Sequence, residues 1–253
     1  LPETAVPGLA ARAAATRLLG AVVDARTSLD GLTDNEHGHP NYLALDGRDR
    51  ALVRAILASA LRHRGTIEAL IAARLDRPLP ENARSLRHIL HVSAAQMLFL
   101  DVPDSAAVDL AVTLARADPR NSRFASLVNA VLREIGRRKD RALPAALRDS
   151  TDAPDWFVTR LRDAYGEDRT AAILAAHRVE APVDFTVKAD PELWAERLGG
   201  VVLPTGSVRV ARPTASVSEL PGYSEGAWWV QDAAAALPAR LLGDLAGQRV
   251  LDL

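Results

Sequence analysis

Arginine is the residue type whose abundance and spacing point to chemistry in this chain. Of the 31 Lys and Arg residues among 253, only Lys139 and Lys188 are lysines. The planar guanidinium group donates two parallel hydrogen bonds to a phosphate, which an ammonium group cannot do. The arginine excess therefore favours phosphate binding, although a genome rich in arginine codons would produce the same composition.

The densest group of cations lies between Arg120 and Arg141, where seven cations accompany two acids. At 100° per residue, the apolar and basic side chains of this stretch fall on opposite faces of a helix. The apolar face holds Phe124, Val128, Val131 and Ile135, and the basic face holds Arg123, Arg133, Arg137 and Arg141. Arginines at this spacing suit the phosphate backbone of a nucleic acid. The alternative is a solvated helix face that binds nothing.

A second group of cations follows Asp46 and contains Arg48, Arg50, Arg54, Arg62, His63 and Arg64. Residues 1–145 hold 20 Lys and Arg against 16 Asp and Glu, whereas residues 146–253 hold 11 against 16. Aromatic residues make up only 4% of the chain, so recognition of phosphates and shape is more expected than stacking of bases. The candidate RNA-binding residues are therefore Arg48, Arg50, Arg62, Arg64, Arg123, Arg133, Arg137 and Arg138.

Other chemistries lack the residues that they need. The chain contains no Cys, which excludes disulfides, thiolate zinc sites and a cysteine nucleophile within these residues. His37 with His39, and His88 with His91, have spacings that could hold a metal, but no third ligand is evident, so no metal site is expected. Neither a Gly-x-Ser-x-Gly turn nor a phosphate-binding loop with a lysine occurs. The sequence predicts no catalytic machinery of its own.

The segment from Glu219 to Asp232 is the most unusual local sequence. Trp228, Trp229 and Val230 predict an apolar strand, and Asp232 is suited to cap a following helix. The amide of Gln231 and the carboxylate of Asp232 would suit the wall of a binding site at this strand-to-helix junction. The alternative is a strand, a helix cap and a core tryptophan pair.

Residues 1–145 predict an all-α bundle of six helices with short connections. Apolar residues at helical spacing and helix-start residues place these helices at about 15–23, 46–61, 66–75, 85–100, 106–116 and 119–138. The polar, Gly-rich segment 30–40 is expected to be a loop.

Residues 146–253 are expected to form a smaller α+β unit, so the predicted fold class is mainly α. The stretch Leu143–Ala153 predicts a linker between the two units. Two amphipathic helices are expected at 155–165 and 167–178, around a break at Gly166. Short β-branched runs predict strands at 184–188, 201–203, 207–210, 227–230 and 250–253.

Several motifs, in this order, resemble a known family. Residues 1–145 resemble the NusB-like helical RNA-binding domain through Arg48-Asp49-Arg50, Leu61-Arg62-His63-Arg64, Gln96-Met97-Leu98-Phe99-Leu100, Ala106-Ala107-Val108 and Val128-Asn129-Ala130-Val131-Leu132-Arg133. The later residues are similar to the start of the bacterial 16S ribosomal RNA cytosine carbon-5 methyltransferases of the RsmB or Sun type. This second resemblance rests on Leu220-Pro221-Gly222-Tyr223, Val230-Gln231-Asp232 and Val250-Leu251-Asp252-Leu253.

The resemblance implies a chain that binds 16S ribosomal RNA and presents it to a methyltransferase domain. Such enzymes are expected to use a cysteine thiolate that adds to carbon-6 of cytosine, which makes carbon-5 nucleophilic toward the methyl group of S-adenosylmethionine. The Rossmann-like sheet that holds this cofactor would begin with the strand at 250–253. We therefore expect the full-length protein to use S-adenosylmethionine, and these residues alone to bind RNA, hold no cofactor and be catalytically inert.

Two other functions fit parts of the sequence. The NusB resemblance alone would permit a standalone RNA-binding antitermination or regulatory factor, and the helical bundle would also serve as a scaffold with an incidental basic surface. No apolar run reaches the roughly 18 residues that a membrane span needs, and the N-terminus lacks the pattern of a signal peptide. The sequence thus predicts a cytoplasmic protein with no membrane partner.

Overall fold

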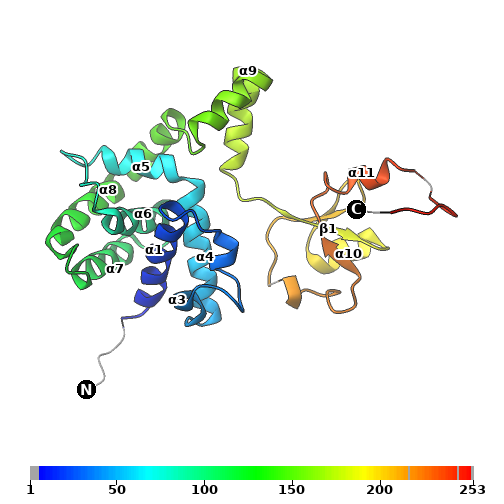
Figure 1. Cartoon of the computed structure of the whole chain (residues 1–253), viewed down its shortest axis with the longest axis horizontal. Helices are drawn as coiled ribbons and strands as arrows, with labels where there is room; N and C mark the ends of the chain where they lie inside the picture. The colour runs from blue at the N-terminus through cyan, green and yellow to red at the C-terminus, as the bar shows by residue number, and fades with distance from the viewer. Residues whose placement is uncertain (1–5, 216, 244, 252–253) are drawn as a thin grey trace. The chain divides into compact units, whose positions relative to one another are not determined.

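The computed structural model describes residues 6–215, 217–243 and 245–251, and it divides the chain into two compact units. The first unit runs to Arg178 and the second begins at Val179 (Figure 1). Each unit has a hydrophobic core cluster of its own.

The described part of the first unit is helical throughout. Its elements are α1 (Leu9–Val23), α2 (Leu29–Leu32), α3 (Pro40–Leu43), α4 (Gly47–Arg62), α5 (Arg64–Ala72), α6 (Arg84–Phe99), α7 (Asp104–Ala117), the 3₁₀ helix η1 (Ser122–Phe124), α8 (Ala125–Asp149) and α9 (Asp155–His177). The six helices predicted for residues 1–145 correspond to α1 and α4–α8. The all-α bundle is therefore confirmed.

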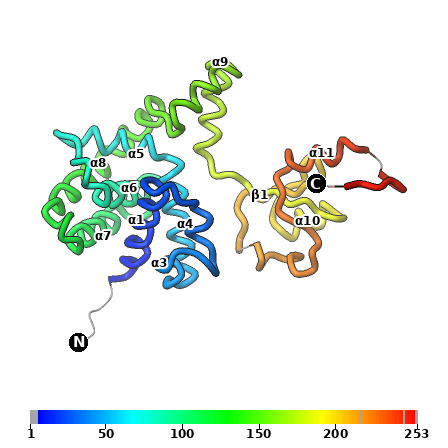
Figure 2. The backbone as a smooth tube through the Cα atoms, in the orientation of Figure 1, coloured from blue at the N-terminus to red at the C-terminus, as the bar shows by residue number. Residues whose placement is uncertain are grey.

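Helix α6 lies at the centre of this unit, and α1, α4, α5, α7 and α8 pack against it (Figure 2). Eleven of its residues are buried, and ten of these are consecutive, from His88 to Met97. A helix that is buried around its whole circumference is a core helix. The polar side chain of Gln96 fits this position because it donates to the Val92 carbonyl at 2.9 Å and accepts from Arg12 at 2.8 Å.

Local caps explain both a confirmed prediction and a wrong one. Asp46 caps α4 as predicted, since its carboxylate accepts a hydrogen bond from the Asp49 N–H at 2.7 Å. The predicted loop at 30–40, however, contains most of α2 and the first residue of α3. Ser28 caps α2, and the His39 ring accepts from the Asn41 N–H at 3.1 Å at the start of α3. Such caps stabilise single helical turns that apolar periodicity does not reveal.

The predicted linker at Leu143–Ala153 is wrong over most of its length, because α8 continues through Pro144 to Asp149. Position 145, where the two domains were expected to divide, thus lies inside a helix. Proline removes one hydrogen bond from the helix, but the last turn of α8 is held by other groups. The Ser150 N–H donates to the Ala146 carbonyl at 2.9 Å, and Arg178 donates to the Leu147 carbonyl.

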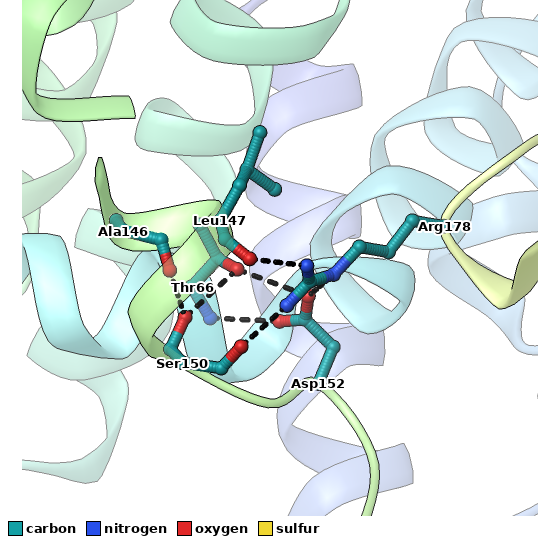
Figure 3. A network of polar contacts seen from close by, with 6 residues as sticks. All are labelled: Thr66, Ala146, Leu147, Ser150, Asp152 and Arg178. Carbon is teal, nitrogen blue, oxygen red and sulfur yellow. Dashed lines mark hydrogen bonds and ion pairs between the residues drawn. The ribbon is translucent and has the colours of Figure 1, made fainter. Parts of the chain in front are cut away.

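One carboxylate, that of Asp152, joins three helices of the first unit (Figure 3). Asp152 accepts from the backbone N–H of Thr66 at 2.7 Å, from the Thr66 hydroxyl at 3.0 Å and from Arg178 Nε at 2.6 Å. Arg178 also donates to the Ser150 carbonyl at 2.6 Å. The start of α5 and the ends of α8 and α9 therefore meet here, which explains why the compact unit extends to Arg178 rather than to 145.

Helix α9 carries the predicted break at Gly166. This glycine has φ 74° and ψ 174°, far from helical values, and a positive φ is readily adopted only by glycine. The chain is helical on either side of Gly166, which agrees with the two helices predicted at 155–165 and 167–178.

The second unit is a small antiparallel sheet with short helices, which confirms the predicted α+β class. Its strands β1 (Val183–Val187), β2 (Val201–Val202), β3 (Val208–Val210) and β4 (Trp228–Val230) have the order β2-β3-β1-β4, and its helical elements are α10 (Pro191–Leu198), η2 (Val217–Glu219) and α11 (Leu237–Arg240). In the core, the fully buried Phe185 meets Trp228 edge-on, with ring centroids 4.7 Å apart.

The strand predicted at 250–253 is not formed in the residues that the structure describes. Val250 and Leu251 are exposed and have no regular secondary structure, because no described strand pairs with them. Asp252 and Leu253 lie outside the described residues.

Gly65→Ala is expected to lower the free energy of unfolding by about 1–3 kcal/mol, the usual cost of overpacking. A Cβ atom at Gly65 would lie 2.0 Å from the Thr151 carbonyl oxygen, beside the Asp152 contacts. Gly47→Ala is the matched control, since nothing lies within 4 Å of that position at the start of α4. Urea denaturation should show no loss for Gly47→Ala, and equal losses for both variants would contradict this account.

The stability of the first unit is expected to fall as pH decreases from about 6 to 4.5. His91 is 4% exposed, and burial lowers its pKa from 6.5 to about 3. In this window the unfolded chain binds a proton that the folded chain does not, so the free energy of unfolding falls by up to about 1.4 kcal/mol per pH unit. Burial also lowers the pKa of His63, which adds to the fall.

Urea denaturation at several pH values measures this effect. His91→Gln should make the decline shallower, whereas His37→Gln, at an exposed position, should leave its slope unchanged. A wild-type protein with constant stability between pH 6 and 4.5 would refute the assignment.

Candidate nucleic-acid interface

An open groove of about 850 Å³ lies in the first unit between α1, the start of α6 and η1. Helix α1 contributes Ala13, Thr16, Arg17 and Gly20, whose spacing of three and four residues places them on one helix face. The other lining residues come from the start of α6, the end of α7 and the following loop, and they include Arg84, Ser85, Ile89, Leu114, Asp118, Arg120, Asn121, Arg123 and Phe124.

Four arginines from separate segments line this groove: Arg17, Arg84, Arg120 and Arg123. Two carboxylates, those of Asp24 and Asp118, line it as well. Four cations against two acids leave a positive balance. Guanidinium groups that converge from different elements suit a ligand with several anionic oxygen atoms.

The N-terminus of α6 opens into the same groove. Ala83 occupies the cap position and has no side chain that could accept the first backbone N–H groups of the helix. These N–H groups have no partner within a helix and carry a partial positive charge. In a helix of 16 residues, such an end favours the binding of a phosphate.

Asp118 orders the loop that carries Arg120 and Asn121. Its carboxylate accepts from the Arg120 backbone N–H at 3.0 Å and from the Arg120 guanidinium at 3.1 and 3.0 Å. These hydrogen bonds lower the pKa of Asp118 below its usual value, so the carboxylate is charged at neutral pH. Asn121 Nδ2 donates to Asp118 Oδ2 at 3.2 Å and to Ser85 Oγ at 2.6 Å. The loop is thereby tied to the first turn of α6.

Part of the groove wall is apolar. Ile89 and Leu114 line it from α6 and α7, and Phe124 lines it from η1. The Arg123 guanidinium lies over the Phe124 ring, 4.7 Å from its centroid, which is a favourable cation–π geometry. The groove therefore combines cations with an apolar surface.

His88 borders the groove next to α1. Its Nε2 atom lies 2.9 Å from Asp24 Oδ2, and the histidine side chain is 7% exposed. A Cβ atom at Gly20 would lie 3.2 Å from His88 Cδ2, so the glycine allows α1 to approach the ring closely. This contact links α1 to α6 beside the arginines.

Only one of the eight predicted RNA-binding residues, Arg123, lines this groove. Arg62 borders a second cavity of about 590 Å³ in the same unit, between the ends of α4 and α8 and helix α9. Arg50 is engaged within the fold, since it donates to the carbonyls of Leu43 and Leu45. The structure does not bring the eight residues together in one groove.

The remaining predicted residues are exposed on helix surfaces. Arg48 and Arg64 lie near the starts of α4 and α5. Along α8, Arg133 donates to Asn129 at 3.0 Å, while Arg137 and Arg138 both pair with Glu134. Two of the three α8 arginines thus share one carboxylate, which offsets part of the charge of that row.

Sequence reasoning missed four polar residues of the groove, Arg17, Arg84, Arg120 and Asn121. Arg17 and Arg84 are single cations on otherwise ordinary helices. The run Asp118-Pro119-Arg120-Asn121 predicts a helix start, and Arg120 belongs to the dense group of cations but not to the predicted basic face. The turn composition of this run, followed by Arg123, is the one sequence signal that could have indicated a basic loop.

Gln231 and Asp232, the possible site wall in the second unit, have local partners. Gln231 Oε1 accepts from the Thr186 hydroxyl at 2.9 Å and from Trp229 Nε1 at 3.1 Å. Asp232 accepts from the Ala234 N–H at 2.8 Å. Trp228 is buried but Trp229 is 47% exposed, so the predicted core tryptophan pair is only half correct.

The described residues contain no group of three or more His, Asp or Glu side chains placed to hold a metal ion. None of their helices is both long and apolar enough to span a membrane.

Comparison with known proteins relates both units to proteins of ribosomal RNA modification. The model of the NusB family matches residues 9–137. Ribosomal RNA small subunit methyltransferase B of Xanthomonas campestris is 36% identical over 99% of this chain, and that of Xylella fastidiosa is 36% identical over 97%. The protein of the same name from Vibrio cholerae is 31% identical over 95% of the chain.

The chain spans 57% of the length of each of these three relatives. Among solved structures, the crystal structure of PH0851 matches 95% of this chain and 56% of its own, with a TM-score of 0.55 and 16% identity. At this level of identity, the structural match supports the fold alone.

Proposed function

The chain belongs to the NusB family and is similar, over nearly its whole length, to ribosomal RNA small subunit methyltransferase B, and on this premise we propose that it is the RNA-binding, substrate-recognising portion of a ribosomal RNA methyltransferase. The observation that carries the proposal is the groove where Arg17, Arg84, Arg120 and Arg123 surround the uncapped start of α6. A groove of this kind is suited to phosphates of an RNA backbone.

The arrangement of charge favours a backbone contact over a small anion. The four guanidinium groups come from α1, the start of α6, the loop after α7 and η1. Four guanidinium groups exceed what a single phosphate needs, whereas successive phosphates of one strand can use all of them. The predicted residues Arg48, Arg62, Arg64 and Arg133 would add phosphate contacts outside the groove.

The finer function is also part of this proposal, and the resemblance to the methyltransferases supports it. The RNA is small-subunit, 16S ribosomal RNA, the reaction is methylation of cytosine carbon-5 with S-adenosylmethionine, and the protein acts in the cytoplasm. That reaction needs a cysteine thiolate, and these 253 residues contain no Cys. The chain itself therefore recognises the RNA and does not transfer the methyl group.

A standalone antitermination factor is less well supported. Such a factor would account for residues 9–137, which match the NusB family. It would leave unexplained why the similarity to the methyltransferases extends over 99% of the chain, and thus through the second unit.

Reversing a groove charge is expected to weaken RNA binding about 10-fold. Arg84→Glu is the best variant, because an acid in the first turn of α6 favours the helix while it repels phosphate. The affinity for a small-subunit ribosomal RNA fragment can be measured by fluorescence anisotropy at low salt. Arg77→Glu, at an exposed position outside the groove, is the matched control and should bind like the wild type.

Arg133→Glu tests, in the same assay, whether the predicted RNA-binding arginines of α8 contact the RNA. Because Arg137 and Arg138 already pair with Glu134, this variant should lose less affinity than Arg84→Glu. Normal binding by Arg84→Glu would show that the groove does not hold the RNA.

The salt dependence of binding gives an independent measurement. If each of the four groove arginines neutralises one phosphate, the logarithm of the association constant should fall by about 3 per logarithmic unit of salt, from roughly 0.7 per phosphate on single-stranded RNA. Arg84→Glu should reduce this slope by about 0.7 or more. A flat response to salt would exclude phosphate recognition as the source of affinity.

A further inference from the structure

The groove contains more than the proposed phosphate contacts require. A surface that reads only phosphates needs cations, but this groove also has an apolar wall formed by Ile89, Leu114 and Phe124. Its volume of about 850 Å³ lies within the roughly 300–1,000 Å³ typical of pockets for small organic groups. An extended backbone alone would leave the apolar wall uncovered.

Asn121 is a buried polar residue of this groove whose side chain is held in place by hydrogen bonds. The residue is 3% exposed, and its Nδ2 atom uses both hydrogens, one toward Ser85 Oγ at 2.6 Å and one toward Asp118 Oδ2 at 3.2 Å. Its Oδ1 atom accepts no hydrogen bond from any residue that the structure describes. An ordered, buried amide whose oxygen is free in a groove is suited to accept a hydrogen bond from an incoming N–H group.

The apolar and polar groups are arranged for a planar ring. Phe124 packs against the core of the first unit and carries the Arg123 guanidinium over its ring at 4.7 Å, so a guanidinium plane supported by an aromatic ring lines the groove. Nucleobases stack on both kinds of plane and carry N–H donors at their edges. Arg17 and Arg84 lie in the same groove and would contact the phosphates on either side of the base.

We propose that this groove takes one unpaired nucleotide of the RNA, with its base stacked on the Arg123 guanidinium that Phe124 supports, its edge on Asn121 and its flanking phosphates on Arg17 and Arg84. The proposal rests on the proposed function and adds to it the class of substrate, an RNA with an unstacked base. It differs from the sequence-based expectation, which favoured recognition of phosphates and shape over stacking of bases.

The test uses the whole chain and three hairpin RNAs that differ at one position. The first has a single bulged adenosine, the second has an abasic residue in that bulge, and the third is fully paired. Fluorescence anisotropy should show that the bulged RNA binds about 10-fold more tightly than the other two, since stacking of one base accounts for an affinity difference of that order. Equal affinities for the adenosine bulge and the abasic bulge would overturn the proposal, because the phosphates are the same in both.

Two outcomes separate this inference from the proposed function. If the wild type binds all three RNAs equally well, the phosphate groove stands and the nucleotide site fails. If it binds none of them at low salt, RNA binding itself fails. Adenosine monophosphate serves as a competitor, and displacement of the RNA by micromolar concentrations would indicate a site for free nucleotides and would also overturn the proposal.

Substitutions in the groove test whether the base binds there. Phe124→Leu should weaken binding of the bulged RNA about 5-fold and leave the abasic RNA unchanged, whereas Phe157→Leu, a partly buried phenylalanine of α9, should change neither. Asn121→Ser should act in the same direction as Phe124→Leu. Thermal unfolding checks that the variants fold, and the wild-type comparison decides the question even if one of them does not.

Discussion

The burial of α6 on all sides is the constraint on which the first unit depends. Five helices surround its buried residues, so its position is fixed by close packing and any loss of volume or added atom is costly. Its N-terminal end has Ala83 where a capping side chain would normally stand. The groove lies at that end, lined by α1, the first turn of α6 and the loop at 118–121.

The acids of the groove order its cations, and in the proposed function they would thereby favour binding of RNA, although they reduce the net charge. Asp118 positions Arg120 and Asn121, and Asp24 pairs with His88. A side chain that is already ordered loses less conformational entropy when a ligand arrives. On the α8 surface, by contrast, Glu134 engages two arginines without placing them beside an apolar wall or a helix end. The same types of residue therefore line a groove in one place and an exposed helix face in the other.

The extent of the first unit shows where local sequence signals fail. Pro144 and mixed charge favoured a linker, but α8 continues to Asp149 and Asp152 binds Thr66 and Arg178 across 86 and 26 positions of sequence. No local pattern encodes contacts over such separations. Gly65 is a second example, since the absence of a Cβ atom makes room for the Thr151 carbonyl. The sequence alone shows only a glycine between two predicted helices.

Local signals in the amino-acid sequence were enough to place most of the helices and strands. Apolar periodicity placed α1 and α4–α8, Asp46 marked the start of α4, Gly166 marked the break in α9, and β-branched runs placed β1–β4. These features depend on residues a few positions apart, so they can be read directly from the chain. Only the tertiary structure decided which arginines face a common groove, because Arg17, Arg84 and Arg120 are far apart in sequence and converge through the packing of α1, α6 and α7 around one core.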